Sequence, residues 1–142
     1  MVIALIADDK KKELMTQFCI AYCGILSKHR LCATGITGKY IFEATGLKIE
    51  KLLSGTQGGA EQITSRIAYN EIDLVLFFRE TSPEMSDSEG AIELLRMCDI
   101  SNVPIATNIA TAEVLVMALE SGGLDWRDIV NPTSEYNQRK KA

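Results

Sequence analysis

Histidine is nearly absent from this sequence, because His29 is the only one among 142 residues. Histidine is a common zinc ligand, so its scarcity leaves cysteine as the main alternative for a zinc site. The chain has four cysteines, but no CxxC pair: they are Cys19, Cys23, Cys32 and Cys98. We therefore expect no metal site, and we expect these thiols to be buried and reduced.

Long apolar runs and an excess of basic residues are also missing. No stretch approaches the roughly 18 apolar residues of a membrane-spanning helix. The apolar run at the N-terminus is short and is followed by the polar residues 8–13, which argues against a signal peptide. The formal net charge is -4 and the pI is near 5.0, so neither a nucleic acid nor an acidic membrane is expected as a partner. We expect a cytoplasmic protein.

The remaining composition is typical of one globular domain. Hydrophobic residues make up 46% of the chain and charged residues 24%. A chain of this length can bury a single core without disulfides or metals.

Apolar segments that resemble strands alternate with segments that resemble helices. We predict strands over residues 2–7, 30–34, 49–53, 73–78 and 103–108. We predict helices over residues 10–29, 39–46, 60–71, 91–99 and 111–122, with 35–38 as a break after the second strand. Such alternation is typical of an α/β fold, here a five-stranded parallel sheet with helices on both faces.

Polar and glycine residues follow each predicted strand, where open parallel sheets bind ligands. They are Asp8 and Asp9, the segment Thr34 to Gly38, Ser54 and Gly55 with Gly58 and Gly59, Arg79 and Glu80, and Thr107 and Asn108. Hydroxyl groups beside glycine N–H groups at helix N-termini are suited to an oxyanion. Lys12, on the first turn of the first helix, would add a cation. The pattern is neither a Walker motif nor GxGxxG, so it indicates an anion site without specifying a nucleotide.

Each of these features also has a purely structural interpretation. The Thr-Gly-x-Thr-Gly segment is compatible with a turn plus a helix N-cap, and Lys12 with a solvated face. The carboxylates in or near these loops are candidates for a general base, but also for first-turn acids that complement helix dipoles. They are Asp8, Asp9, Glu61, Glu80, Asp87 and Glu89.

Several blocks of the chain, in order, resemble the methylglyoxal synthase family. They are "IALIADDKKKELM", "LCATGITGKYIFEATGLKIEKLLSGTQGG", "IDLVLFFR" and "NVPIATNIATAEVLV". The second block is similar to the family's ATGTTG-type and LSGPxGG-type phosphate-binding loops. The resemblance runs to about Pro132, which implies a domain over residues 1–132 and a C-terminal tail over 133–142.

This resemblance implies a flavodoxin-like, three-layer fold assembled as a homohexamer. It implies a lyase that converts dihydroxyacetone phosphate to methylglyoxal and inorganic phosphate without a metal or organic cofactor. A carboxylate removes a proton beside the carbonyl, an enediolate forms, and phosphate leaves. The family's phosphate-binding positions correspond here to Lys12, Thr34, Gly35, Thr37, Gly38, Ser54 and Gly55. Asp9 matches an active-site aspartate of the family.

The residues that carry out the family's chemistry are replaced. The catalytic aspartate that directly follows the Gly-Gly pair is Ala60 here. A second aspartate, after the FFR-type strand end, is Glu80. Two family histidines correspond to Asp8 and Asp87, and a loop threonine is Ile36.

Three hypotheses remain open. In the first, the chain is an enzyme with a rearranged site that uses Asp9, Glu61 or Glu80, although one residue along a helix turns a side chain by about 100°. In the second, the phosphate site binds an anionic metabolite without chemistry, as in a sensor; the related domain of carbamoyl phosphate synthetase binds effectors. In the third, the chain is a structural subunit, which would not need the retained threonines.

Overall fold

The central sheet of this computed structural model is parallel throughout and has five strands in the order β3-β2-β1-β4-β5. The structure describes residues 1–53, 59–82 and 89–130. The strands are β1 (Val2–Ala7), β2 (Arg30–Thr34), β3 (Ile49–Leu52), β4 (Leu74–Phe78) and β5 (Ile105–Ala106). The predicted α/β class and the five parallel strands are confirmed.

Strand β1 lies in the middle of the sheet because its side chains are apolar on both faces. All six of its residues are buried, and it pairs with β2 on one side and β4 on the other. Ile3 and Leu5 belong to one apolar core, whereas Val2, Ala4 and Ile6 belong to the second. This alternation, with a period of two residues, gives the sheet two buried faces and the fold three layers.

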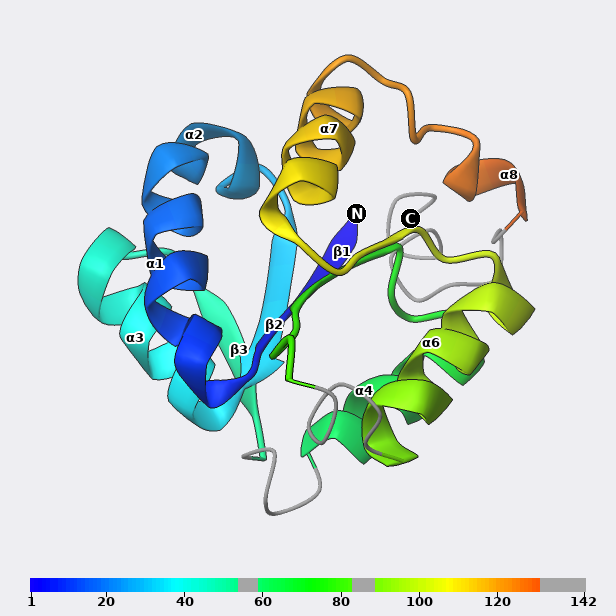
Figure 1. The fold of residues 1–142 in the computed structure, drawn as a ribbon. Helices are drawn as coiled ribbons and strands as arrows, with labels where there is room; N and C mark the ends of the chain where they lie inside the picture. The colour runs from blue at the N-terminus through cyan, green and yellow to red at the C-terminus, as the bar shows by residue number, and fades with distance from the viewer. Residues whose placement is uncertain (54–58, 83–88, 131–142) are drawn as a thin grey trace.

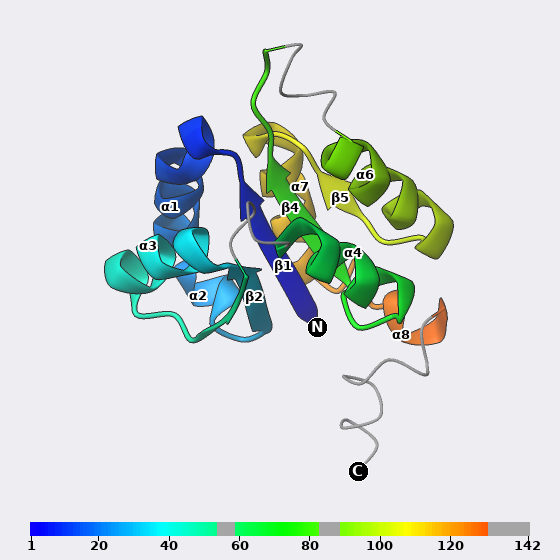
Figure 2. The same cartoon turned by 90° about the horizontal axis from the view of Figure 1, so that it is seen from below.

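Helices cover both faces of the sheet (Figures 1 and 2). One face is covered by α1 (Lys12–Ala21), α2 (Cys23–Leu26), α3 (Gly35–Thr45) and α7 (Ile109–Glu120), and the other by α4 (Gly59–Ala68) and α6 (Glu89–Ser101). A 3-10 turn, η1 (Asp9–Lys11), precedes α1, and α8 (Arg127–Val130) ends the described chain. No described helix is both long and apolar enough to cross a bilayer.

Two predicted helices differ from those observed. The helix predicted over 10–29 is divided into η1, α1 and α2, with a break at Tyr22, whose ψ of 22° leaves the helical range. The helix predicted over 39–46 begins four residues earlier, so the segment 35–38 is its first turn and not a break. Glycine is tolerated there because the first four N–H groups of a helix have no partner within it.

The cysteines agree only in part with the prediction. All four are free thiols, but Cys23 is half-exposed while the other three are buried. Burial raises the pKa of Cys19 to about 12, so this thiol stays protonated at physiological pH. The boundary predicted at residue 132 lies outside the described residues.

A buried ion pair fastens α8 to the sheet, which the sequence did not indicate. The Arg127 guanidinium lies 3.5 Å from a carboxylate oxygen of Asp73, and both side chains are almost fully buried. Arg127 also donates to the carbonyl oxygens of Ile72 at 3.2 Å and Asn102 at 3.0 Å. The second oxygen of Asp73 accepts from the N–H of Val2 at 2.9 Å. The pair therefore joins α8, the start of β1 and the segment that leads into β4.

Candidate functional site

The strand order reverses between β1 and β4, and open α/β sheets bind ligands beside such a reversal, at the carboxyl ends of the strands. Asp8 directly follows β1, and its N–H donates to the carbonyl oxygen of Phe78 at 3.1 Å. Its carboxylate accepts from the N–H of Glu80 at 2.7 Å. Asp8 therefore joins the ends of β1 and β4 and orients the segment that follows β4, a role that the sequence did not reveal.

The carboxylate of Glu80 is engaged in the same segment. One of its oxygens accepts from the N–H of Thr81 at 2.9 Å and from that of Ser82 at 3.2 Å. The side chain thus caps the backbone that follows it. Among the described residues, the other carboxylate oxygen accepts no hydrogen bond, so these two bonds orient the side chain and leave one oxygen available.

Lys12 and Asp9 form a pair at the end of β1. The Lys12 ammonium donates to Asp9 at 2.8 Å and to the carbonyl oxygen of Ala7, the last residue of β1, at 3.2 Å. The bond to Lys12 and the charge of Lys12 lower the pKa of Asp9, whose side chain is fully exposed. A lowered pKa keeps Asp9 ionised and makes it a weaker base, while Lys12 places a cation at the carboxyl edge of the sheet.

Thr34 and Thr37 lie together at the end of β2. Both are buried, and their hydroxyl oxygens are 3.4 Å apart. Thr34 is the extended residue before α3 but makes no side-chain capping bond, so the N-cap interpretation of this threonine is not supported. The two hydroxyls and the first turn of α3 therefore provide donors at the N-terminus of a helix, as an oxyanion requires. Ile36, between them, is exposed.

The start of α4 is pressed against this threonine pair, and glycine makes the approach possible. A Cβ on Gly59 would overlap the carbonyl oxygen of Leu53 and would lie 2.8 Å from the Thr34 methyl group. Gln62 also holds this region, because its side-chain oxygen accepts from the N–H of Leu53 at 2.7 Å. Gln62 was not predicted as a site residue from the sequence. The only indication was its position about one helical turn after Gly59.

Replacing Gly59 with alanine should therefore displace α4 from β3. The obstacle is backbone, so we expect a loss of about 2 kcal/mol or more in the free energy of unfolding, in the range of an overpacked site. We also expect a loss of phosphate binding. Urea unfolding and phosphate titration would measure both. Gly24→Ala is the matched control, since nothing lies within 4 Å of its added Cβ; equal effects of the two substitutions would contradict this account.

Ala60 and Glu61 lie on the first turn of α4, directly after Gly59, which packs against Thr34. Ala60 and Glu61 line a groove of about 490 Å³ between these helices, with Glu93 and Met97 on the α6 side. The side of α4 that faces the sheet is occupied by Gly59 and other buried residues. Glu61 is exposed. Within the described part of the chain, Glu61 forms no hydrogen bond or ion pair with Lys12, Thr34 or Thr37.

Several predicted site residues lie outside the part of the chain that the structure describes. They are Ser54, Gly55, Gly58 and Asp87, together with the side chain of Glu89. Gly38 is buried within α3, where an added Cβ would lie 3.2 Å from the Lys51 side chain, so a small residue is favoured there. Asn108, after β5, is a helix cap: its side chain accepts from the N–H of Thr111 at 3.1 Å.

His29 lies at the other end of the strands, just before β2. Its Nδ1 is 3.1 Å from the terminal amine of Met1. Burial and this positive charge lower the His29 pKa to about 4, with a smaller lowering by Lys28 and an opposing effect of Glu120. The imidazole is therefore neutral at physiological pH.

This lowered pKa predicts a loss of stability in acid. The unfolded chain takes up a proton on His29 below about pH 6.5, whereas the folded chain does so only near pH 4. The contribution should be complete above pH 6.5 and be lost as the pH falls toward 4. Chemical denaturation at several pH values would show this slope, and it should be shallower in His29→Gln. An unchanged slope in that variant would contradict the assignment to His29.

The chain is similar to known proteins of one family. Residues 16–107 match the family model described as MGS-like domain. The chain is 56% identical over 141 residues to the methylglyoxal synthase of Caldicellulosiruptor saccharolyticus, covering 99% of this chain and 100% of that one. It is 50% identical over 129 residues to the methylglyoxal synthase of Listeria welshimeri, covering 91% and 96% of the two chains.

The fold also matches a solved structure. The crystal structure of methylglyoxal synthase from Elizabethkingia anophelis aligns with a TM-score of 0.73 at 38% identity, over 81% of this chain and 76% of that one. The flavodoxin-like fold expected from the sequence is thereby confirmed. Sequence and structure together show that this chain belongs to the methylglyoxal synthase-like family.

Proposed function

We propose that this protein binds a phosphorylated small molecule at the carboxyl ends of β1 and β2, with dihydroxyacetone phosphate as the ligand. Lys12 supplies the cation, and the buried hydroxyls of Thr34 and Thr37 supply neutral donors. The names of the relatives support a substrate of this class. Gly35, Gly38, Ser54 and Gly55 complete the proposed phosphate site.

The family reaction requires three groups around the three-carbon ketone. A base removes the proton next to the carbonyl, a donor stabilises the enediolate oxygen, and the phosphate site holds the leaving group. In this proposal, Lys12 and the hydroxyls of Thr34 and Thr37 hold the phosphate leaving group. The electron pair left on carbon expels phosphate through the enediolate and gives the enol of methylglyoxal. This enol takes up a proton on its CH2 carbon and loses its hydroxyl proton, which gives methylglyoxal.

This chain lacks the family's catalytic base. The observation that carries this conclusion is Ala60, which occupies the position of the family's catalytic aspartate. A methyl group cannot accept a proton. The three candidate replacements each differ from an aspartate at position 60: Asp9 is fully exposed and paired with Lys12, Glu80 is bonded to the backbone of its own segment, and Glu61 is exposed and turned by about 100° around α4 from position 60. We therefore propose binding with greatly reduced conversion, as in a catalytically degenerate sensor or regulatory protein.

Full methylglyoxal synthase activity is the second candidate function. The observation that favours it is 56% identity over nearly the whole chain to a protein of that name. In that case Asp9, Glu61 or Glu80 would act as the base. A ligand that drew the exposed Glu61 inward would be needed, because errors of about 1 Å in such positions cost on the order of 100-fold in rate.

The remaining parts of the proposal follow from family membership. We propose a homohexamer in the cytoplasm, without a cofactor, in which residues 1–132 form the family domain and 133–142 a tail.

The binding proposal can be tested by calorimetric titration with inorganic phosphate and with dihydroxyacetone phosphate. Thr37→Val keeps the size of the side chain but removes a buried hydroxyl, so affinity for both ligands should fall by about tenfold. Thr45→Val is a matched control, because Thr45 lies at the other end of α3, where its hydroxyl donates to the carbonyl oxygen of Ile41 and accepts from the N–H of Leu47. Equal affinity of Thr37→Val and the unmodified protein would contradict the proposed site.

A further inference from the structure

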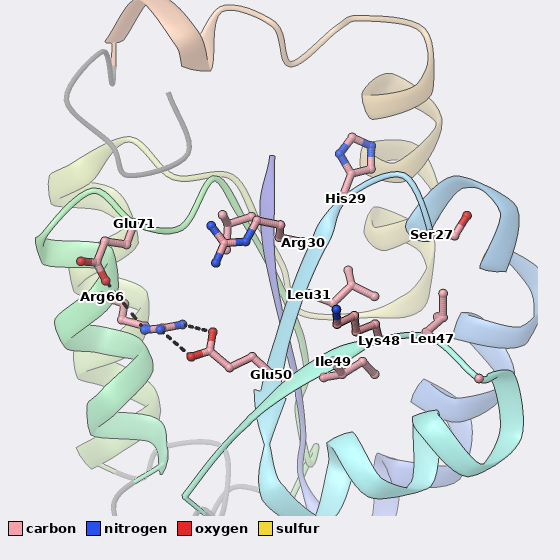
Figure 3. A pocket seen from close by; sticks show the side chains of 12 residues that line it. Ser27, His29, Arg30, Leu31, Leu47, Lys48, Ile49, Glu50, Arg66 and Glu71 are labelled. Carbon is pink, nitrogen blue, oxygen red and sulfur yellow. Dashed lines mark hydrogen bonds and ion pairs between the residues drawn. The ribbon is translucent and has the colours of Figure 1, made fainter. Parts of the chain in front are cut away.

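Two side chains of α4, one helical turn apart, hold the edge strand β3. Arg66 donates two hydrogen bonds to the carboxylate of Glu50, at 2.9 and 2.8 Å (Figure 3). Gln62 lies four residues before Arg66, on the same side of the helix, and its side-chain oxygen accepts from the N–H of Leu53 at 2.7 Å. Glu50 belongs to β3 and Leu53 directly follows this strand. The first contact therefore anchors the strand, and the second anchors the chain at its carboxyl end.

The backbone of Leu53 is held by two different helices. Its N–H, in the peptide plane before the residue, is bound by Gln62 of α4. Its carbonyl oxygen, in the plane after the residue, accepts from the N–H of Gly35 at the start of α3, at 3.4 Å. The last registered pair of β2 and β3 is Thr34 with Leu52, so Leu53 lies beyond the ladder. Its orientation therefore depends on these two bonds.

The bond between Leu53 and Gly35 is long for a hydrogen bond. N–H···O bonds are typically about 2.9–3.0 Å, so at 3.4 Å the Gly35 donor is only weakly used. Gly35 lies on the first turn of α3, where N–H groups have no partner within the helix, and it belongs to the proposed phosphate site. A Leu53 carbonyl that moved closer would occupy this donor and would direct a negative dipole at the bound anion.

From these contacts we infer that Gln62 is a positioning residue for the phosphate site. By holding the N–H of Leu53 on the side of α4, it keeps the Leu53 carbonyl from taking the N–H of Gly35, which stays available to a phosphate oxygen. Gly59 permits this arrangement, because a Cβ at that position would overlap the same carbonyl oxygen. The inference rests on the proposed function, since it concerns the same anion site.

A role of Gln62 in stability alone has a different consequence. The side chain is exposed, so water replaces the hydrogen bond when the residue is changed, and the stability of the fold changes little. Phosphate binding, in contrast, depends on whether the Gly35 donor is free. The two roles are therefore separated by measuring phosphate affinity and resistance to urea on the same variant.

The test is calorimetric titration of Gln62→Met with inorganic phosphate. Methionine has a similar length but offers only a weak acceptor, so we expect the affinity to fall by at least about fivefold. The control is Gln17→Met, because Gln17 is exposed on α1 and its side chain forms no hydrogen bond among the described residues. The control should bind phosphate like the unmodified protein, and both variants should have the same urea midpoint. Equal phosphate affinity of Gln62→Met and the unmodified protein would overturn the inference and leave the proposed phosphate site intact.

The amide resonance of Gly35 provides a readout that does not need phosphate. In Gln62→Met it should move downfield, because the Leu53 carbonyl forms a shorter bond with this N–H. Gln62→Glu keeps an acceptor oxygen and should restore the resonance position of the unmodified protein. An unchanged Gly35 resonance in Gln62→Met would overturn the inference, whereas absence of phosphate binding by the unmodified protein would refute the proposed function.

Discussion

Ala60→Asp should raise the rate of methylglyoxal formation from dihydroxyacetone phosphate by at least about 100-fold. General-base catalysis by a positioned side chain contributes on the order of 100- to 10,000-fold, and the family has its catalytic aspartate at this position. An aspartate is also compatible with the local structure, because residue 60 is half-exposed and lies on the first turn of α4, where a negative charge favours the helix dipole. Methylglyoxal and phosphate release would both be followed.

The matched control is Ala60→Asn, which has nearly the same shape but cannot accept the proton. We expect its rate to stay at that of the unmodified protein. Two results would contradict the account: a gain in the asparagine variant equal to that of the aspartate variant, or no gain in either while phosphate still binds. The second would place the loss of chemistry elsewhere, with Glu80 the next position to change.

Arg127→Ala should lower the free energy of unfolding by about 3–5 kcal/mol, the typical cost of breaking a buried ion pair by removing one partner. The side chain is fully buried, and its removal leaves the Asp73 charge without a cation. It also leaves the carbonyl oxygens of Ile72 and Asn102 without this donor. Burial lowers the Arg127 pKa, with Asp73 opposing this, which indicates that the charge is stabilised by its partner and not by water. Urea unfolding would measure the loss.

Lys28→Ala provides the comparison. It breaks the ion pair with Glu120, which is shorter, at 2.7 Å, but exposed on both sides. Exposed pairs contribute about 1 kcal/mol or less, so this variant should be nearly as stable as the unmodified protein. A Lys28 effect as large as the Arg127 effect would contradict the role assigned to burial. A double variant, Arg127→Met/Asp73→Asn, should recover part of the loss, because it removes the unpaired buried charge.

The sheet was predictable from the sequence because its inner strands carry a strong local signal. Val2–Ala7 and Leu74–Phe78 are uninterrupted apolar runs, and both are observed as central strands. The break at Tyr22 and the early start of α3 at Gly35 were not predictable in the same way. They depend on how the helix ends meet the sheet, and local propensity is overridden there by tertiary contacts.

The candidate site was predictable in position but not in detail. The sequence placed Lys12, Thr34 and Thr37 at strand ends, and the structure brings the two threonines together and places Lys12 on the end of β1. It did not indicate that Asp8 would bind the backbone of Glu80, because the two are 72 residues apart. The ion pair of Arg127 and Asp73 was not predictable for a similar reason: the two residues are far apart in the sequence and come into contact only in the folded chain.

The most direct test of the central claim uses the unmodified protein and dihydroxyacetone phosphate. Calorimetry would measure binding, and the same sample would be assayed for methylglyoxal against a blank without protein. We predict saturable binding that inorganic phosphate displaces, with methylglyoxal formation close to the blank. Rapid methylglyoxal formation by the unmodified chain would contradict the account, because it would show that another group acts as the general base in place of a carboxylate at position 60.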